Sequence, residues 1–169
     1  MISIHKKLNL VDNGKLSFTE EKITLGKIKD NKVRVKPIIV GVCSSDIPRC
    51  FDKKAYHYPL VIGHEFLVEV ISDPSNNLEK GEKCAVFPLR PCLKCFSCSL
   101  KEYNRCSNYS YYGSRVDGGM QSILDIDRWN LVPLPKNLDN ISGSLIEPTA
   151  VCIHASEYAK NASKILLFG

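Results

Sequence analysis

A short polar stretch decides the fold: residues 91–108, which read PCLKCFSCSLKEYNRCSN. Two residues separate Cys92 from Cys95 and Cys95 from Cys98, and seven separate Cys98 from Cys106. Zinc takes four ligands in a tetrahedron with Zn–S bonds of about 2.3 Å, and a two-residue gap lets both sulfurs of a Cys-x-x-Cys turn reach one ion. The spacing therefore predicts a zinc lobe that is ordered by its metal and not by an apolar core beneath it.

An iron–sulfur cluster, a disulfide pair and a redox Cys-x-x-Cys are the alternative uses of these thiols. Bacterial ferredoxins share the two-residue gaps, but their fourth cysteine follows after three residues and precedes proline. Here Cys106 follows after seven residues and precedes serine. These differences favour zinc.

The composition is that of an ordinary globular protein. The 169 residues are 44% hydrophobic and 24% charged, and no apolar run approaches the roughly 18 residues of a membrane span. The N-terminus, MISIHKKLNL, lacks the apolar core and cleavage site of a signal peptide. The net charge of +5 is spread among acids, which favours a solvated surface over a nucleic-acid partner. Eight cysteines without a secretion signal favour metal binding over disulfides, so we expect a cytoplasmic protein with no membrane or nucleic-acid partner.

Segments with strand character run along most of the chain. Alternating or continuous apolar residues predict strands in 32–43, 60–72 and 82–88, and two more within 118–135. Gly, Pro and Asn interrupt these segments, as in an all-β barrel or sandwich. Residues 45–51, SDIPRCF, predict a short helix between the first two strands.

The pattern changes near Ile141. Small and apolar residues at helical spacing predict a helix within GSLIEPTAVCIHASEYA, residues 143–159. The last segment, KILLFG at 164–169, predicts a buried parallel strand that ends at a glycine. A strand followed by glycine is how a dinucleotide-binding βαβ unit begins. We therefore expect one domain over residues 1–140, and over 141–169 the linking helix and first strand of a truncated nucleotide-binding domain.

Four more residues have side chains that bind metals. Cys43 lies in GVCSSD, His64 and Glu65 lie in GHE, and Glu147 lies in IEPTAV. Each is weak evidence alone, because a lone cysteine is usually buried in a core and a glutamate near a helix start is often a dipole partner. Spacing cannot join them, since they lie far apart in the sequence.

Together the motifs resemble the zinc-containing medium-chain dehydrogenase/reductase superfamily. The matching features, in the expected order, are GVCSSD, YPLVIGHE, GEKCAV, the four-cysteine stretch, the DGG of RVDGG, and EPTAV before ILLFG. The resemblance implies a mainly β fold. It consists of a GroES-like catalytic domain, which is a partly open β-barrel over residues 1–140 with a zinc lobe at 91–108, followed by the truncated start of a Rossmann α/β domain.

The resemblance also implies two zinc ions, one structural and one catalytic. The four cysteines of the lobe would hold the structural ion. Cys43, His64 and Glu147 look like the ligands of the catalytic ion. Glu65 is similar to the glutamate that approaches this metal directly or holds it through water.

Other positions take their roles from the same resemblance. Asp46 resembles the carboxylate that orients the ligand histidine, and Ser45 resembles the hydroxyl residue that passes on the substrate proton. NAD or NADP would bind through the missing domain, to which Gly169 would contribute. The implied reaction is oxidation of a secondary alcohol to a ketone by hydride transfer. We expect the fragment alone to be inactive and the full-length parent to be a homo-oligomer.

The substrate class follows from Glu147 together with SSDIPR, YHYP and YGSRVDGG, which resemble the polyol branch and, within it, galactitol-1-phosphate 5-dehydrogenases. The implied substrate is a sugar alcohol or a sugar-alcohol phosphate such as galactitol 1-phosphate. Arg49 and Arg115 are candidates to bind a phosphate group. The alternative is that both are ordinary surface arginines, which the sequence does not distinguish from phosphate ligands. Sorbitol, L-iditol or another secondary alcohol stays open as substrate, as does a non-enzymatic, zinc-stabilised binding module.

Overall fold

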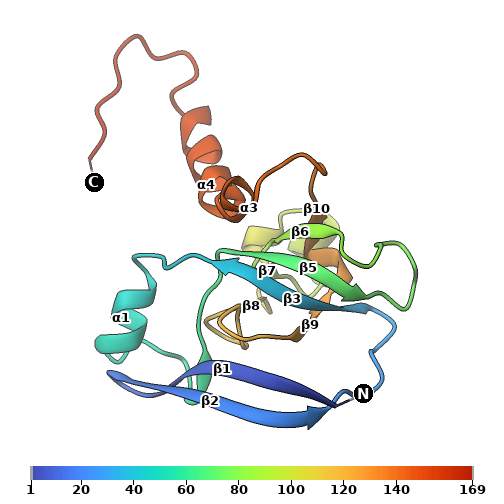
Figure 1. The fold of residues 1–169 in the computed structure, drawn as a ribbon. Coiled ribbons are helices and arrows are strands. Elements are labelled where there is room, and N and C mark those ends of the chain that lie inside the picture. The colour runs from blue at the N-terminus through green and yellow to red at the C-terminus, as the bar shows by residue number, and fades with distance from the viewer. Residues whose placement is uncertain (1, 169) are drawn as a thin grey trace.

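The computed structural model describes residues 2–168 and is mainly β, as the sequence predicts. Figure 1 shows the strands gathered below and a helical segment leading away from them to the C-terminus. The strands are β1 (Ile2–Asp12), β2 (Lys15–Thr24), β3 (Lys32–Val40), β4 (Leu60–Val61), β5 (Phe66–Ser72), β6 (Lys83–Val86), β7 (Leu89–Arg90), β8 (Ser110–Tyr111), β9 (Leu124–Asp127) and β10 (Leu131–Pro133). The helices are α1 (Asp46–Phe51), α2 (Phe96–Ser99), α3 (Asn140–Ser144) and α4 (Ile146–Glu157), with 3₁₀ turns η1 (Tyr103–Arg105) and η2 (Arg128–Asn130).

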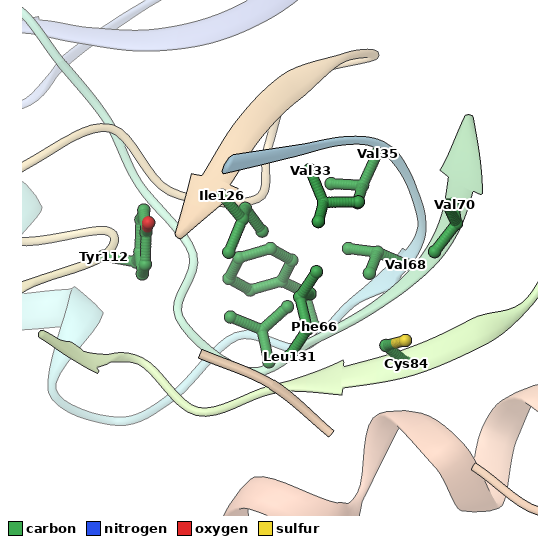
Figure 2. Packing of buried hydrophobic residues seen from close by; sticks show 10 residues of the cluster. Val33, Val35, Phe66, Val68, Val70, Cys84, Tyr112, Ile126 and Leu131 are labelled. Carbon is green, nitrogen blue, oxygen red and sulfur yellow. The ribbon is translucent and has the colours of Figure 1, made fainter. Parts of the chain in front are cut away.

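The largest sheet has five strands in the order β10-β6-β5-β3-β9, and all of its pairings are antiparallel. Its buried face carries the main core, which Figure 2 shows gathered around Phe66. Alternate residues of β3 and β5 supply half of the core, because successive side chains of a strand point to opposite faces. Each large apolar side chain buried there contributes about 1.5–3 kcal/mol. The core members are Val33, Val35, Phe66, Val68, Val70, Cys84, Val86, Tyr112, Ile126 and Leu131.

The strands predicted within residues 32–135 are confirmed, with the segment 60–72 divided into β4 and β5, and so is the short helix in 45–51. The sequence reading missed the N-terminal hairpin, in which β1 pairs antiparallel with β2. Its turn contains Asn13-Gly14, and Gly14 has a φ of 69°. Asn-Gly between two strands is a strong hairpin signal, so this element was predictable.

The strand predicted over 164–169 is wrong for its described part, residues 164–168, which form no regular element. The side chains from Ile165 to Phe168 are 67–91% exposed. A strand needs a neighbour to satisfy its backbone groups, and no strand of the described chain lies beside this segment. The helix predicted upstream is present as α4, and the division into two domains stays a prediction. None of the described helices has the length and apolar character to cross a membrane.

Candidate metal centre

The structure brings together Cys43, His64 and Glu65. One ligand atom from each lies within 4.8 Å of the others, although Cys43 follows β3 and the other two lie in the loop between β4 and β5. Glycine permits this approach at Gly41, where a Cβ would lie 2.6 Å from Glu65 Oε2. The Gly41 N–H also donates to the Glu65 carbonyl at 2.7 Å. The two loops therefore meet along backbone as well as through side chains.

Three glycines hold the loop that carries His64. Gly63 has a φ of 92°, a conformation that favours glycine. Its carbonyl accepts from the Gly119 N–H at 2.8 Å. A Cβ on Gly113 would lie 2.6 Å from the same carbonyl oxygen. The DGG motif thus has a structural reason: its backbone packs directly on the residue before His64.

Asp46 connects Cys43 to His64. Its Oδ2 accepts from the Cys43 N–H at 3.1 Å, and its Oδ1 lies 3.5 Å from His64 Nδ1. That second distance is an ion-pair contact and not a well-formed hydrogen bond, and Nδ1 has no hydrogen-bond partner among the described residues. Burial lowers the pKa of His64, but Asp46 and then Cys43 raise it, and the net shift is upward. A buried imidazole between a carboxylate and a thiol is a fitting metal ligand.

Glu147 is close to this group but does not belong to it. It lies in the first turn of α4, and its Oε1 accepts from the Tyr111 hydroxyl at 3.4 Å. Burial raises the pKa of Glu147, the charge of His64 lowers it, and the charge of Glu65 raises it again. The Tyr111 ring also contacts that of His64, so Glu147 lies near the metal cluster but is not among the groups whose ligand atoms lie within 4.8 Å of one another.

Tyr111 is a residue of this site that the sequence analysis did not identify. Its ring meets the His64 ring edge-on, with centroids 5.8 Å apart. Burial, followed by the charge of Glu147, raises the pKa of Tyr111 well above its usual value, so the hydroxyl stays a donor. No local sequence signal identified it, because tyrosines are equally common in cores and in clefts.

A cavity of about 670 Å³ opens beside Glu147 and Tyr111. It lies between α4 and the β6–β7 segment, and its walls are mostly apolar. Lining residues include Phe87, Leu89, Val132 and Val151. The cavity could therefore hold the carbon skeleton of a small molecule with a polar group near the cluster.

The four cysteines of the lobe also converge, as the spacing predicts. One sulfur from each lies within 4.8 Å of the others. The sulfurs of Cys95 and Cys106 are 3.8 Å apart, too far for a disulfide. Sulfurs about 2.3 Å from a tetrahedral zinc would lie about 3.8 Å apart. Backbone N–H groups, led by that of Cys98, lower the pKa of Cys95, whereas burial raises the pKa of Cys98. A bound metal would hold both as the thiolates that zinc requires.

The remaining predicted site residues belong to neither metal cluster found within residues 2–168. Ser45 is exposed and directly precedes α1. The Arg49 guanidinium forms an ion pair with the Asp46 carboxylate. The Arg115 guanidinium lies over two aromatic rings, 4.3 Å from the centroid of Tyr56 and 4.4 Å from that of Tyr109. Gly169 lies outside the described residues.

Comparison with known proteins places these features in a family. The family model for the alcohol dehydrogenase GroES-like domain matches residues 29–136. Galactitol 1-phosphate 5-dehydrogenase of Escherichia coli is 36% identical over 132 residues, covering 77% of this chain and 38% of the relative. Sorbitol dehydrogenase of Bombyx mori is 32% identical over 163 residues, covering 88% of this chain and 45% of the relative. This chain therefore spans less than half the length of either relative.

A solved structure gives the same fold. The crystal structure of a zinc-binding dehydrogenase from Sinorhizobium meliloti, bound to NADP, matches with a TM-score of 0.82 at 25% identity. The match covers 92% of this chain and 46% of that one.

Proposed function

The chain belongs to the alcohol dehydrogenase GroES-like family of zinc-containing medium-chain dehydrogenases, and we propose that it is the metal-binding part of an NAD(P)-dependent alcohol or polyol dehydrogenase. The observation that carries the proposal is the convergence of Cys43, His64 and Glu65 from separate loops, with the buried Asp46 behind them. Thiolate, imidazole and carboxylate are all zinc ligands. The chain holds these three groups within the reach of one ion. A cavity that could take a substrate is lined by Tyr111, whose ring contacts that of His64.

Two sets of residues would hold zinc. The four cysteines of the lobe would form a closed structural site, in keeping with the four thiolate ligands such sites use. Cys43 and His64 would hold the catalytic ion together with a carboxylate from Glu65 or Glu147. Zinc bound there would supply a Lewis acid that makes a substrate hydroxyl easier to ionise.

The chain's own residues would bind and orient the substrate. Asp46 would fix the ring of His64, and the Tyr111 hydroxyl would hold the Glu147 carboxylate by donating a hydrogen bond to it. The exposed hydroxyl of Ser45, two residues beyond Cys43, would carry the proton released from the substrate. The apolar cavity walls would exclude water from the substrate's carbon atoms.

We propose a sugar alcohol or a sugar-alcohol phosphate as the substrate. The resemblance to the E. coli galactitol 1-phosphate 5-dehydrogenase supports the phosphate form, and that to the silkworm sorbitol dehydrogenase supports the free polyol. Arg115 is the better candidate for a phosphate grip, because Arg49 is already engaged by Asp46. The stacked Tyr rings would hold the Arg115 guanidinium in a fixed orientation.

NAD or NADP would bind a nucleotide domain of the full-length protein, joined to this chain through α4. The NADP-bound relative supports this assignment. We also propose a reducing compartment such as the cytoplasm, since all eight cysteines are free thiols in the structure.

The test has two parts. Screening the full-length protein against galactitol 1-phosphate, galactitol, sorbitol and simple secondary alcohols, each with NAD and with NADP, should reveal oxidation of one polyol class. Counting metals on the purified chain separates an enzyme from a zinc-stabilised binding module. Two zinc ions per chain support the enzyme, whereas a single ion held by the four cysteines and no dehydrogenase activity would support the module.

A further inference from the structure

We propose that Arg49 is a positioning residue that fixes Asp46, and through it His64 and Cys43, in the geometry that binds the catalytic metal. The inference rests on the proposed metal site and adds a residue to it. It also gives Arg49 a different role from a phosphate grip.

The first support is the burial of the pair. The Asp46 side chain is 2% exposed and that of Arg49 is 14% exposed. Asp46 lies in the first turn of α1 and Arg49 in its last turn, three residues apart, so both face the same side of the helix. Solvent cannot replace the guanidinium as the partner of this carboxylate. His64 Nδ1 also lies 3.5 Å from Oδ1, but Arg49 is the partner that keeps its charge at every pH. A buried carboxylate that loses such a partner is strongly destabilising.

The second support is that the two carboxylate oxygens of Asp46 contact different groups. Oδ1 accepts a hydrogen bond from Arg49 Nη1 and also lies 3.5 Å from His64 Nδ1. Oδ2 receives the Cys43 N–H at 3.1 Å. A single carboxylate orientation therefore serves both the imidazole and the backbone of the thiol residue. Rotation of the Asp46 side chain would release both of them, and the bond from Arg49 opposes that rotation.

The third support is the choice of arginine at this position. A guanidinium has several donors fixed in one plane and keeps its charge when buried, whereas a lysine ammonium is a strongly hydrated point charge. A residue that served only to grip substrate would gain from exposure. Arg49 instead directs its charge inward, to the residue that lies behind the metal ligands.

The experiment measures metal binding directly, with Co²⁺ as the probe on the complete chain. The four-cysteine lobe is an internal reference, because its ligands come from a separate segment. Arg49→Met should weaken Co²⁺ binding at the Cys43–His64 site by about 10–100-fold. The lobe should keep its affinity. Arg49→Lys, or added guanidinium ion with Arg49→Met, should restore part of the loss.

Arg128→Met is the matched control. Arg128 forms a comparable pair with Asp73, whose side chain is fully buried, but neither residue belongs to a metal cluster of the described residues. This variant should lose stability and keep both cobalt affinities. Unchanged cobalt affinity in Arg49→Met would overturn the inference. So would an equal loss at both sites with no rescue, since that would mark Arg49 as merely structural.

The outcome for the unaltered chain separates this inference from the proposed function. If the unaltered chain binds cobalt only at the lobe, the proposed catalytic site fails and the role of Arg49 fails with it. If the unaltered chain binds two ions and the Met variant binds both equally well, only the role of Arg49 is refuted.

Discussion

Replacing Gly118 by alanine tests how the loop carrying His64 is held. A Cβ on Gly118 would lie 2.6 Å from the Cα of Gly113 and closer still to the carbonyl oxygen of Gly63. Both neighbours are backbone atoms, so neither can rotate away as a flexible side chain would. The two loops must therefore separate, and His64 follows Gly63 directly in the chain.

The size of the effect follows from the contact. Overpacking usually costs about 1–3 kcal/mol, and rigid backbone neighbours place Gly118→Ala near the upper end. We expect a loss of about 2–3 kcal/mol in the free energy of unfolding. For a chain of this size, 1 kcal/mol corresponds to about 2–4 °C, so Tm should fall by about 4–12 °C. Metal binding at the Cys43–His64 site should weaken as well, because His64 moves with its loop.

The assay is urea and thermal unfolding of Gly118→Ala beside Gly26→Ala. A Cβ on Gly26 meets no atom within 4 Å among the described residues, so the control should lie within about 0.5 kcal/mol of the unaltered chain. If Gly118→Ala were as stable as Gly26→Ala and bound Co²⁺ normally, the loops would not be held by this backbone contact.

Three other predictions concern the ion pair between Asp73 and Arg128, the four-cysteine lobe and the substrate. Burial would raise the pKa of Asp73, but Arg128 and Ser75 hold it well below its usual range. Asp73 therefore stabilises the fold fully above about pH 4. That contribution should be lost progressively as the pH falls below 4. The difference in the free energy of unfolding between the unaltered chain and Asp73→Asn, measured in urea, should therefore be smaller at pH 3 than at pH 7. An equal difference at both pH values would refute this role of Asp73. Cys98→Ser should remove one zinc ion and lower Tm while the Cys43 site keeps its metal, as metal analysis and calorimetry can show; joint loss of both ions would contradict independent sites. Arg115→Met in the full-length enzyme should raise KM for a polyol phosphate by about 10-fold or more and leave KM for the free polyol unchanged; equal effects on both substrates would argue against a phosphate grip.

Local spacing was enough to predict some parts of this molecule. The cysteines of the lobe lie close together in the sequence, so their convergence follows from turn geometry alone. The strands β3, β5 and β6 follow from apolar patterns that repeat within a few residues. These elements depend on neighbours in the sequence, which a single chain reveals directly.

Other parts depend on distant segments. Cys43 and His64 lie on different loops, and only resemblance to a family joined them before the structure did. The position of Glu147 next to Tyr111 depends on how α4 packs, which no local pattern specifies. The predicted strand in 164–168 failed for the same reason: its apolar residues suit a strand, but a strand forms only where a partner strand is present.

Metal stoichiometry of the purified chain and of Cys43→Ser tests the central claim most directly. The account predicts two zinc ions per unaltered chain and one in Cys43→Ser, with the remaining ion on the four cysteines. Two ions retained after Cys43→Ser, or a single ion in both proteins, would contradict it.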